Sequence, residues 1–287
     1  PFASFFKIIT YNYPREEIRY FLENNLNILL TNDDGINSPG LWAMAEALSA
    51  LGNVTVVVPD RDQSGKGASM TLLRPLTMEK VSTRGVNIRA AYSIEGSPAD
   101  CVIMGTELIC DDPVDLVVSG INPGANLGLD VFNSGTFGAA LHGYFRGINS
   151  IAVSSKYDGD VIYGPASMVG AAVSNAVLQG NHDTNMLLNI NLPPLEFVDI
   201  KGVELTRLGP KAYLEGIEEF TNGRRTYYWV KHNRQTDEVV EIGTDVWAVD
   251  NDKVSISIIN PYLASYECGS ISLELAKAAE SSLNPSF

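Results

Sequence analysis

The sequence predicts an α/β fold in which a mainly parallel sheet is flanked by helices. Two observations support this prediction. Short apolar runs alternate with helical patterns from residue 26 to about residue 195, which is the order of right-handed strand–helix–strand units. Hydrophobic residues make up 45% of the 287 residues and charged residues only 19%, so the chain can build a substantial core and is not disordered.

The elements of this core follow from the positions of apolar runs and helix starts. The expected strands, each a short apolar run, span residues 26–31, 54–58, 114–118, 150–154 and 186–192. The expected helices span residues 39–48, 97–109, 137–145 and 166–178. Two of these helices open with Ser-Pro, at Ser38 and Ser97. Serine is a favoured N-cap, and proline fits the first helical position.

The pattern changes after Pro193-Pro194. Further strands are expected at 203–208, 226–231, 239–241 and 254–259, with a turn at Asn222-Gly223 and a terminal helix at 271–281. We expect β-hairpins that project from the core and embrace a second subunit; a separate small β-domain is the alternative.

Charge and cysteine content exclude several classes of function. The net charge of −14 argues against nucleic-acid and membrane partners, because phosphates would be repelled. A small phosphorylated ligand is still possible, since a bound cation inverts the local charge. The three cysteines form no CxxC pair, which indicates reduced thiols in a cytoplasmic protein. No run reaches the roughly 20 apolar residues of a membrane span, and residues 1–25 lack a signal-peptide pattern.

The most informative segment is Thr31-Asn32-Asp33-Asp34-Gly35-Ile36, which follows the first strand. Ligands of parallel α/β sheets bind just beyond the carboxyl ends of strands. Two adjacent carboxylates at such a place suit a hard divalent cation, which prefers oxygen ligands. The alternative is that one aspartate caps the next helix and the other is solvated, since Asp is common at caps and turns.

Three further polar loops can converge with Asp33 and Asp34 at one edge of the sheet. They span residues 59–65, 119–128 and 133–136. Together they offer carboxylates, hydroxyls, an amide oxygen and a glycine-rich backbone, a set that suits Mg²⁺ or Mn²⁺ plus a phosphate but not zinc. In Ser134-Gly135-Thr136, two hydroxyls and a helix N-terminus would attract an anion; an ordinary helix cap is the alternative. We expect His142 to pack or hydrogen-bond, and Arg61, Lys66 and Arg74 to attract phosphate or to pair with acids.

In these motifs the sequence resembles the SurE family of metal-dependent 5′-nucleotidases. The resemblance is carried by ILLTNDDGINSPG at 28–40, VVVPDRDQSG at 56–65, GSPADCV at 96–102, VVSGINPGANLG at 117–128, NSGTFGAA at 133–140 and the tail at 244–261. It implies a Rossmann-like fold, one Mg²⁺ or Mn²⁺ ion per subunit and hydrolysis of nucleoside 5′-monophosphates. Whether 3′-nucleotides and short polyphosphate are further substrates stays open. The implied metal ligands are Asp33, Asp34, Ser64 and Asn122. The implied phosphate contacts are Ser134, Gly135 and Thr136, together with Asn122.

The sequence leaves the mechanism and two rival functions open. Asp33 and Asp34 are the expected catalytic residues, one of them orienting or deprotonating the attacking water. Some members of the family carry histidine where this chain has Asn133, so a histidine at that position cannot be the proton donor here. A phosphatase with an aspartate nucleophile would want acids two residues apart, whereas Gly35 occupies the required place. The second rival is a non-catalytic nucleotide-binding module.

The resemblance also sets the expected division of the chain. Residues 1–25 are an N-terminal extension without a counterpart in the family, residues 26–200 form the Rossmann-like catalytic core, and residues 201–287 form an oligomerisation arm. The expected assembly is a homodimer or homotetramer.

Overall fold

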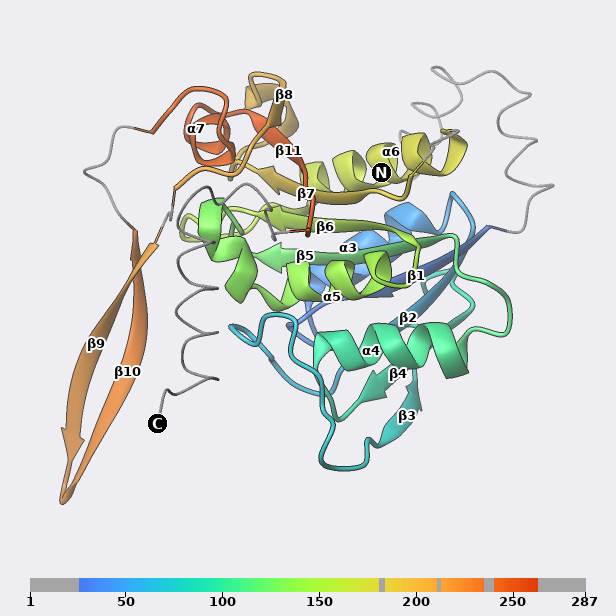
Figure 1. Cartoon of the computed structure of the whole chain (residues 1–287), viewed down its shortest axis with the longest axis horizontal. Helices are drawn as coiled ribbons and strands as arrows, with labels where there is room; N and C mark the ends of the chain where they lie inside the picture. Colours follow the sequence, from blue (N-terminus) through green and yellow to red (C-terminus); the bar gives the residue numbers. More distant parts are fainter. Residues whose placement is uncertain (1–25, 181–183, 211–212, 235–239, 263–287) are drawn as a thin grey trace, which may run out of the picture.

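The computed structural model describes residues 26–180, 184–210, 213–234 and 240–262. Its body is a nine-stranded sheet in the order β3-β4-β2-β1-β5-β6-β7-β11-β8, covered by helices (Figure 1). Neighbouring strands are parallel except for the pairs β3–β4 and β7–β11. The predicted α/β fold with a mainly parallel sheet is therefore confirmed.

The central strands are buried on both faces of the sheet. They are β1 (Asn27–Thr31), β2 (Asn53–Pro59) and β5 (Leu116–Pro123). In β1, Ile28 and Leu30 join the hydrophobic core on one face, and Leu29 joins the core on the other. Continuous apolar runs form such strands because successive side chains alternate between two covered faces.

Two pairs of helices cover these faces. Helices α3 (Pro39–Leu48) and α6 (Tyr163–Gln179) pack together on one face, and α4 (Pro98–Met104) and α5 (Gly135–Tyr144) on the other (Figure 1). The Ser-Pro starts have different local chemistry. Ser97 forms a capping box with Asp100, whereas Ser38 occupies the N-cap position without a side-chain hydrogen bond. None of the helices within the described residues is long and apolar enough to span a membrane.

Two strands at one edge of the sheet lack a clear sequence signal. They are β3 (Met78–Val81) and β4 (Ala90–Ile94). Glu79 and Lys80 are exposed in β3, and β4 has the composition AAYSI, which contains a single β-branched residue. Tertiary pairing, rather than a strong local preference, places these segments in the sheet.

The remaining elements complete the described chain, and α7, β9 and the two 3₁₀-helices among them were not predicted. They are the π-helix η1 (Gly105–Ile109), the 3₁₀-helices η2 (Gly128–Asn133) and η3 (Phe197–Asp199), α7 (Asp245–Asp250), and the strands β6 (Asn149–Ser155), β7 (Leu187–Leu192), β8 (Val203–Thr206), β9 (Tyr213–Asn222), β10 (Arg225–Arg234) and β11 (Val254–Ile258).

Beyond residue 200 the structure has one β-hairpin rather than several. Strands β9 and β10 pair antiparallel around the expected turn and project from the body (Figure 1). Strands β8 and β11 instead extend the main sheet, so the sheet continues past residue 200. Val240 and Glu241 are not in a strand. Residues 1–25 and the expected helix at 271–281 lie outside the described residues.

The order of strands places a topological switch point at β1. The chain passes from β1 to β2 on one side, and β5 later joins β1 on the other side. Thr31, the last residue of β1, is the register partner of Ser119 in β5. Ligands of open α/β sheets bind at such a point, and the loops that carry the expected site residues start there.

Candidate metal and phosphate site

A compact turn fixes both aspartates at the carboxyl end of β1. The buried Asn32 side chain accepts a hydrogen bond from the Gly35 amide and donates one to the Gly35 carbonyl, each 3.1 Å long. Gly35 has a φ of +85°, a conformation that glycine adopts without strain. Asp33 and Asp34 therefore sit on a turn that is braced from within.

Asp33 is buried where three loops meet. The residue is only 3% exposed, and Asp33 Oδ1 accepts a 2.5 Å hydrogen bond from the Thr136 hydroxyl. A Cβ atom on Gly135 would lie 2.8 Å from the Asp33 Cβ, so only glycine allows α5 to begin this close. The Asp33 carbonyl accepts a 2.7 Å hydrogen bond from the Gln63 amide. The loops after β1 and β2 and the start of α5 are thus joined at Asp33.

Asp34 has a buried oxygen without a hydrogen bond. Its Oδ2 lacks a partner among the described residues, as does the nearby buried Ser38 hydroxyl. Burial, followed by the charges of Asp33 and Asp62, raises the pKa of Asp34 to about 7. The neighbouring Ser38 side chain lowers this pKa, although the two groups do not form a hydrogen bond. The interpretation of one aspartate as a helix cap and the other as solvated is wrong, because Ser38 holds the N-cap position and Asp33 is buried.

The carboxylates of Asp33 and Asp34 fit a hard divalent cation. Burial raises the pKa of Asp33, and the Thr136 hydrogen bond opposes this shift. Buried carboxylates are costly unless they are neutralised or paired. The available ligand atoms are oxygens, as Mg²⁺ and Mn²⁺ require, and the unpartnered Asp34 Oδ2 is one of them.

Ser64 lies on the loop after β2, and Asn122 lies near the carboxyl end of β5. The Ser64 hydroxyl is exposed and donates to Asp62 Oδ1 at 2.6 Å. The Asn122 Nδ2 donates to the Gly124 carbonyl at 2.6 Å, which leaves the amide oxygen to face a ligand. Among the described residues, no hydrogen bond joins Ser64 or Asn122 to Asp33 or Asp34. Their role as metal ligands therefore stays a prediction.

The site is not a cluster of three acidic, histidine or cysteine ligands. Within the described part of the chain, no group of three or more such side chains is close enough to hold a metal ion. Asp62 raises the pKa values of Asp33 and Asp34 through its charge, but its Oδ1 already accepts from the Ser64 amide and hydroxyl. Any further ligands of an ion held by Asp33 and Asp34 would thus be neutral oxygens.

The expected phosphate loop occupies the N-terminus of α5. Ser134 is its N-cap, and Ser134 Oγ accepts a 3.1 Å hydrogen bond from the Phe137 amide. The interpretation of Ser134 as a helix cap is thus confirmed. Its hydroxyl can still donate its own proton in a hydrogen bond to an anion. Thr136 is fully buried and its hydroxyl points to Asp33, which sequence reasoning did not anticipate.

Other candidates have structural partners. His142 Nε2 hydrogen-bonds to the Ala68 carbonyl at 3.1 Å, and burial lowers its pKa, in line with a packing role. Arg61 pairs with Asp60 and Glu95, and Arg74 also pairs with Glu95. These arginines pair with acids at the surface.

Sequence reasoning missed Asp62 and Tyr163. Asp62 lies in the polar loop at 59–65, but nothing in the sequence distinguished it from the other residues of that loop. Tyr163 begins α6, and its ring packs so tightly over Gly40 that a Cβ there would be 2.6 Å from Tyr163 Cε1. Burial raises the pKa of Tyr163, and the negative charge of Asp34 raises this pKa further. No local pattern in the sequence marks this long-range contact.

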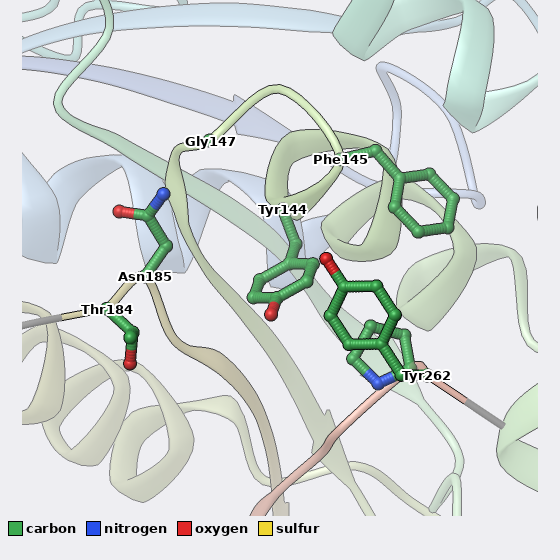
Figure 2. Close-up of a pocket in the computed structure, with 7 residues that line it drawn as sticks. Tyr144, Phe145, Gly147, Thr184, Asn185 and Tyr262 are labelled. Atoms are coloured by element: carbon green, nitrogen blue, oxygen red, sulfur yellow. The ribbon is translucent and has the colours of Figure 1, made fainter. Parts of the chain in front are cut away.

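A pocket of about 450 Å³ lies away from these residues. Its lining residues include Tyr144, Phe145, Asn185 and Tyr262, and Figure 2 shows the Tyr144 and Tyr262 rings close together. It adjoins the amino ends of β6 and β7, whereas Asp33 and Asp34 follow the carboxyl end of a parallel strand. Among the described residues that line it, none carries a carboxylate or a cationic side chain. Its chemistry does not fit a metal and a phosphate, so the carboxylate pair marks the better site.

Comparisons with known proteins point to one family. A model of the family described as "Survival protein SurE" matches residues 28–215. The chain is 44% identical over 240 residues to "5'-nucleotidase SurE" of Dehalococcoides mccartyi, covering 83% of this chain and 90% of the relative. It is 40% identical over 243 residues to "5'-nucleotidase SurE 1" of Thermus thermophilus, covering 84% and 94%. The crystal structure of the SurE protein from Aquifex aeolicus superposes with a TM-score of 0.75 at 38% identity, covering 87% of this chain and 99% of that chain.

Proposed function

Because this chain belongs to the SurE family, we propose that it is a 5′-nucleotidase, a phosphoric monoester hydrolase that releases phosphate from nucleoside monophosphates. Its relatives are named 5'-nucleotidase SurE at 37–44% identity over most of the chain. The observation that carries the proposal is the pair Asp33 and Asp34 at the switch point of the sheet, in which Asp33 is buried against the N-terminus of α5. Carboxylates that suit a cation and a helix N-terminus that suits an anion thus lie at the same place.

One Mg²⁺ or Mn²⁺ ion per subunit is the expected cofactor. Asp33 and Asp34 would hold it, with the Ser64 hydroxyl and the Asn122 amide oxygen as further ligands. When bound, such an ion neutralises phosphate charge and lowers the pKa of a bound water. Since the net charge of the chain is −14, local neutralisation is also what allows an anionic substrate to approach.

The start of α5 would hold the phosphoryl group. The Gly135 amide and the Ser134 hydroxyl are the expected donors to an anion, and the helix dipole adds a partial positive charge. The Thr136 hydroxyl already donates to Asp33, so it would act by fixing the start of α5 against the carboxylate. The Asn122 side chain approaches from β5. Donors that are fixed before the substrate binds stabilise the charge that develops on the phosphoryl oxygens in the transition state.

The two aspartates have different surroundings and thus different expected roles. Asp33 Oδ1 is engaged by Thr136, and the residue is almost fully buried, which suits a fixed ligand. Asp34 is more accessible and has a carboxylate oxygen without a hydrogen bond. Asp34 is therefore the better candidate to orient the attacking water and to accept its proton.

A substrate panel with each metal tests this function. Purified protein should hydrolyse p-nitrophenyl phosphate and nucleoside 5′-monophosphates only after Mg²⁺ or Mn²⁺ is added to chelator-treated enzyme. Parallel assays with 3′-nucleotides and short polyphosphate define the substrate range. Binding of nucleotides without turnover would support the non-catalytic module instead, and a trapped phospho-aspartate would support the aspartate nucleophile.

We further propose that the β9–β10 hairpin joins two copies of this chain. Ile217 and Val230 face each other on one side of the hairpin, and Phe220 and Tyr227 on the other, and all four are exposed. A two-stranded hairpin with apolar side chains on both faces is marginally stable alone in water. Contact with a second subunit would bury these side chains in a homodimer or homotetramer.

A further inference from the structure

A buried carboxylate outside the candidate site holds the loop that leads into it. Asp245, the first residue of α7, is fully buried. Its Oδ2 accepts a 2.8 Å hydrogen bond from the Gly128 amide, and its Oδ1 accepts bonds of 2.8 Å from the Gly209 and Val246 amides. An ionised carboxylate is tolerated in a protein interior only when such donors surround it. The fold thus keeps a carboxylate whose burial is energetically unfavourable at the start of α7.

Gly128 is the contact that connects Asp245 with the candidate site. It starts η2, and the residue that follows η2 is Ser134, the N-cap of α5. Gly128 has a φ of +55°, and a Cβ there would lie 1.8 Å from the Pro210 carbonyl oxygen. The backbone therefore approaches α7 and its neighbouring loop as closely as glycine permits, and Asp245 fixes the start of a segment that ends at the phosphate loop.

The same loop is held at a second point by β7. The Asn126 amide donates to Asn191 Oδ1 at 2.8 Å, and the Asn126 carbonyl accepts from the Nδ2 atoms of Asn189 and Asn191 at 2.9 and 3.0 Å. Asn189 and Asn191 are fully buried. Between these anchors, Leu127 packs in a small core with residues of α7. Residues 126–128 are thus braced by α7 and by the sheet.

The two halves of the candidate site depend on different braces. Asp33 and Asp34 are held by the turn in which Asn32 bonds to Gly35. The start of α5 follows the segment that Asp245 holds. The Thr136–Asp33 bond also joins the two halves. Displacement of that segment would strain this bond and move the Ser134 end of the anion-binding turn, while the Asn32–Gly35 bonds keep the carboxylate turn intact.

We propose that Asp245 is a positioning residue for the reaction, because it fixes the loop at Gly128 and thereby aligns Ser134, Gly135 and Thr136 with Asp33. This inference rests on the proposed function, since it assigns the start of α5 to the phosphoryl group. Asp245 touches no substrate. Its loss is expected to impair phosphate binding and turnover without a matching loss of cation affinity.

Asp245→Asn tests this role, with Thr244→Val as its matched control. Asn cannot accept hydrogen bonds at both side-chain ends, so the Gly128 or the Gly209 amide loses its acceptor. Thr244 is also buried; it caps α7 at the Trp247 amide and donates to the Glu241 carbonyl, but makes no hydrogen bond to Gly128. Both variants remove buried hydrogen bonds near the N-terminus of α7, so both are expected to unfold at lower temperature.

Kinetics then separate positioning from stability. With p-nitrophenyl phosphate and saturating Mn²⁺, well below both melting temperatures, we expect Asp245→Asn to lose about ten-fold or more in kcat/KM. Inhibition by inorganic phosphate should weaken, while the Kd for Mn²⁺ alone stays within about two-fold of wild type. Thr244→Val should retain wild-type kinetics. Equal kinetic losses in both folded variants, or wild-type kinetics in Asp245→Asn, would overturn the positioning role.

A second variant keeps the proposal testable if Asp245→Asn does not fold. Val246→Ala leaves the carboxylate in place but removes packing between α7 and Leu127. It should lower kcat/KM several-fold without weakening Mn²⁺ binding; wild-type kinetics in this variant would overturn the proposal. If the wild-type protein itself turned over no phosphate ester, the proposed function would fail. Active wild type with an equally active Asp245→Asn would refute the positioning role alone.

Discussion

The Thr136 hydroxyl donates a 2.5 Å hydrogen bond to Oδ1 of Asp33, although the two residues are 103 positions apart in the sequence. This bond joins the start of α5 to the turn after β1. Gly135 makes the approach possible, because any Cβ at that position would collide with Asp33. The group expected to hold a cation and the group expected to hold an anion are thus parts of one packed unit.

Ser134→Ala and Thr136→Val are expected to have different effects. The Ser134 hydroxyl can donate to a phosphate, so Ser134→Ala should raise KM and lower kcat, costing on the order of 1–3 kcal/mol of transition-state binding. Thr136→Val also removes the hydrogen bond to Asp33 and should weaken Mn²⁺ binding. Steady-state kinetics beside calorimetric Mn²⁺ titration separates the two effects. Unchanged kinetics in Ser134→Ala would leave that residue as a helix cap alone.

Gly135→Ala should destabilise the protein and abolish most activity. The new Cβ would lie 2.8 Å from the Asp33 Cβ and 2.9 Å from its Oδ2, so α5 or the carboxylate must move. Overpacking of this kind costs roughly 1–3 kcal/mol, measurable by urea denaturation. Gly164→Ala in α6 is the control, because its Cβ would meet no atom within 4 Å. Equal stability of the two variants would contradict the close contact.

Stability of the metal-free protein should depend on pH through Asp34. Its pKa is about 7 in the folded chain and 3.8 as the reference value, so folded protein retains a proton that unfolded chain releases. Asp34 therefore does not lower the free energy of unfolding below about pH 4, and it lowers this free energy increasingly as pH rises to about 7. With chelator present, Asp34→Asn should be more stable than wild type at pH 8 by on the order of 1–3 kcal/mol, and no more stable at pH 4.

Urea denaturation at both pH values checks this expectation. The exposed Glu46 in α3 offers a control of the same charge, and Glu46→Gln should change the free energy of unfolding little at either pH. If Asp34→Asn raised the free energy of unfolding equally at pH 4 and pH 8, the carboxylate charge would not be the cause.

Self-association should depend on the exposed apolar side chains of the hairpin. Trp229 is 62% exposed on β10, and Trp229→Glu would place a charge where a second subunit is expected to pack. Light scattering at micromolar concentration should show an oligomer for wild type and smaller species for this variant. Leu73→Glu, at a fully exposed position of a loop on the body, should leave the assembly unchanged. A monomeric wild-type protein would refute the proposed role of the hairpin.

The sequence predicted the parts of the fold that have strong local signals. Apolar runs such as 26–31 and the Ser-Pro starts identified most central strands and helices. Strand β4 was missed because its residues have weak strand preference and depend on pairing with β2. β8 and β11 read as hairpin strands because a short apolar run does not reveal its partner, and here the partners are each other and β7.

The candidate site was predictable only at the level of loops. The residues after β1, β2 and β5 carried signals because chemistry and turn formation both leave polar residues and glycines there. Contacts that depend on packing across the sequence left no pattern. The bond from Thr136 to Asp33, the approach of Tyr163 to Asp34 and the hold of Asp245 on Gly128 belong to this class.

Calorimetric Mn²⁺ titration of chelator-treated wild type and Asp34→Asn, with turnover of adenosine 5′-monophosphate measured on the same samples, tests the metal-assisted mechanism most directly. Wild type should bind about one Mn²⁺ ion per subunit and gain activity in proportion to occupancy. Asp34→Asn should remain folded, bind Mn²⁺ far more weakly and lose nearly all turnover. Near-full activity of Asp34→Asn at saturating Mn²⁺ would contradict the assignment of the buried aspartate pair as the catalytic metal site.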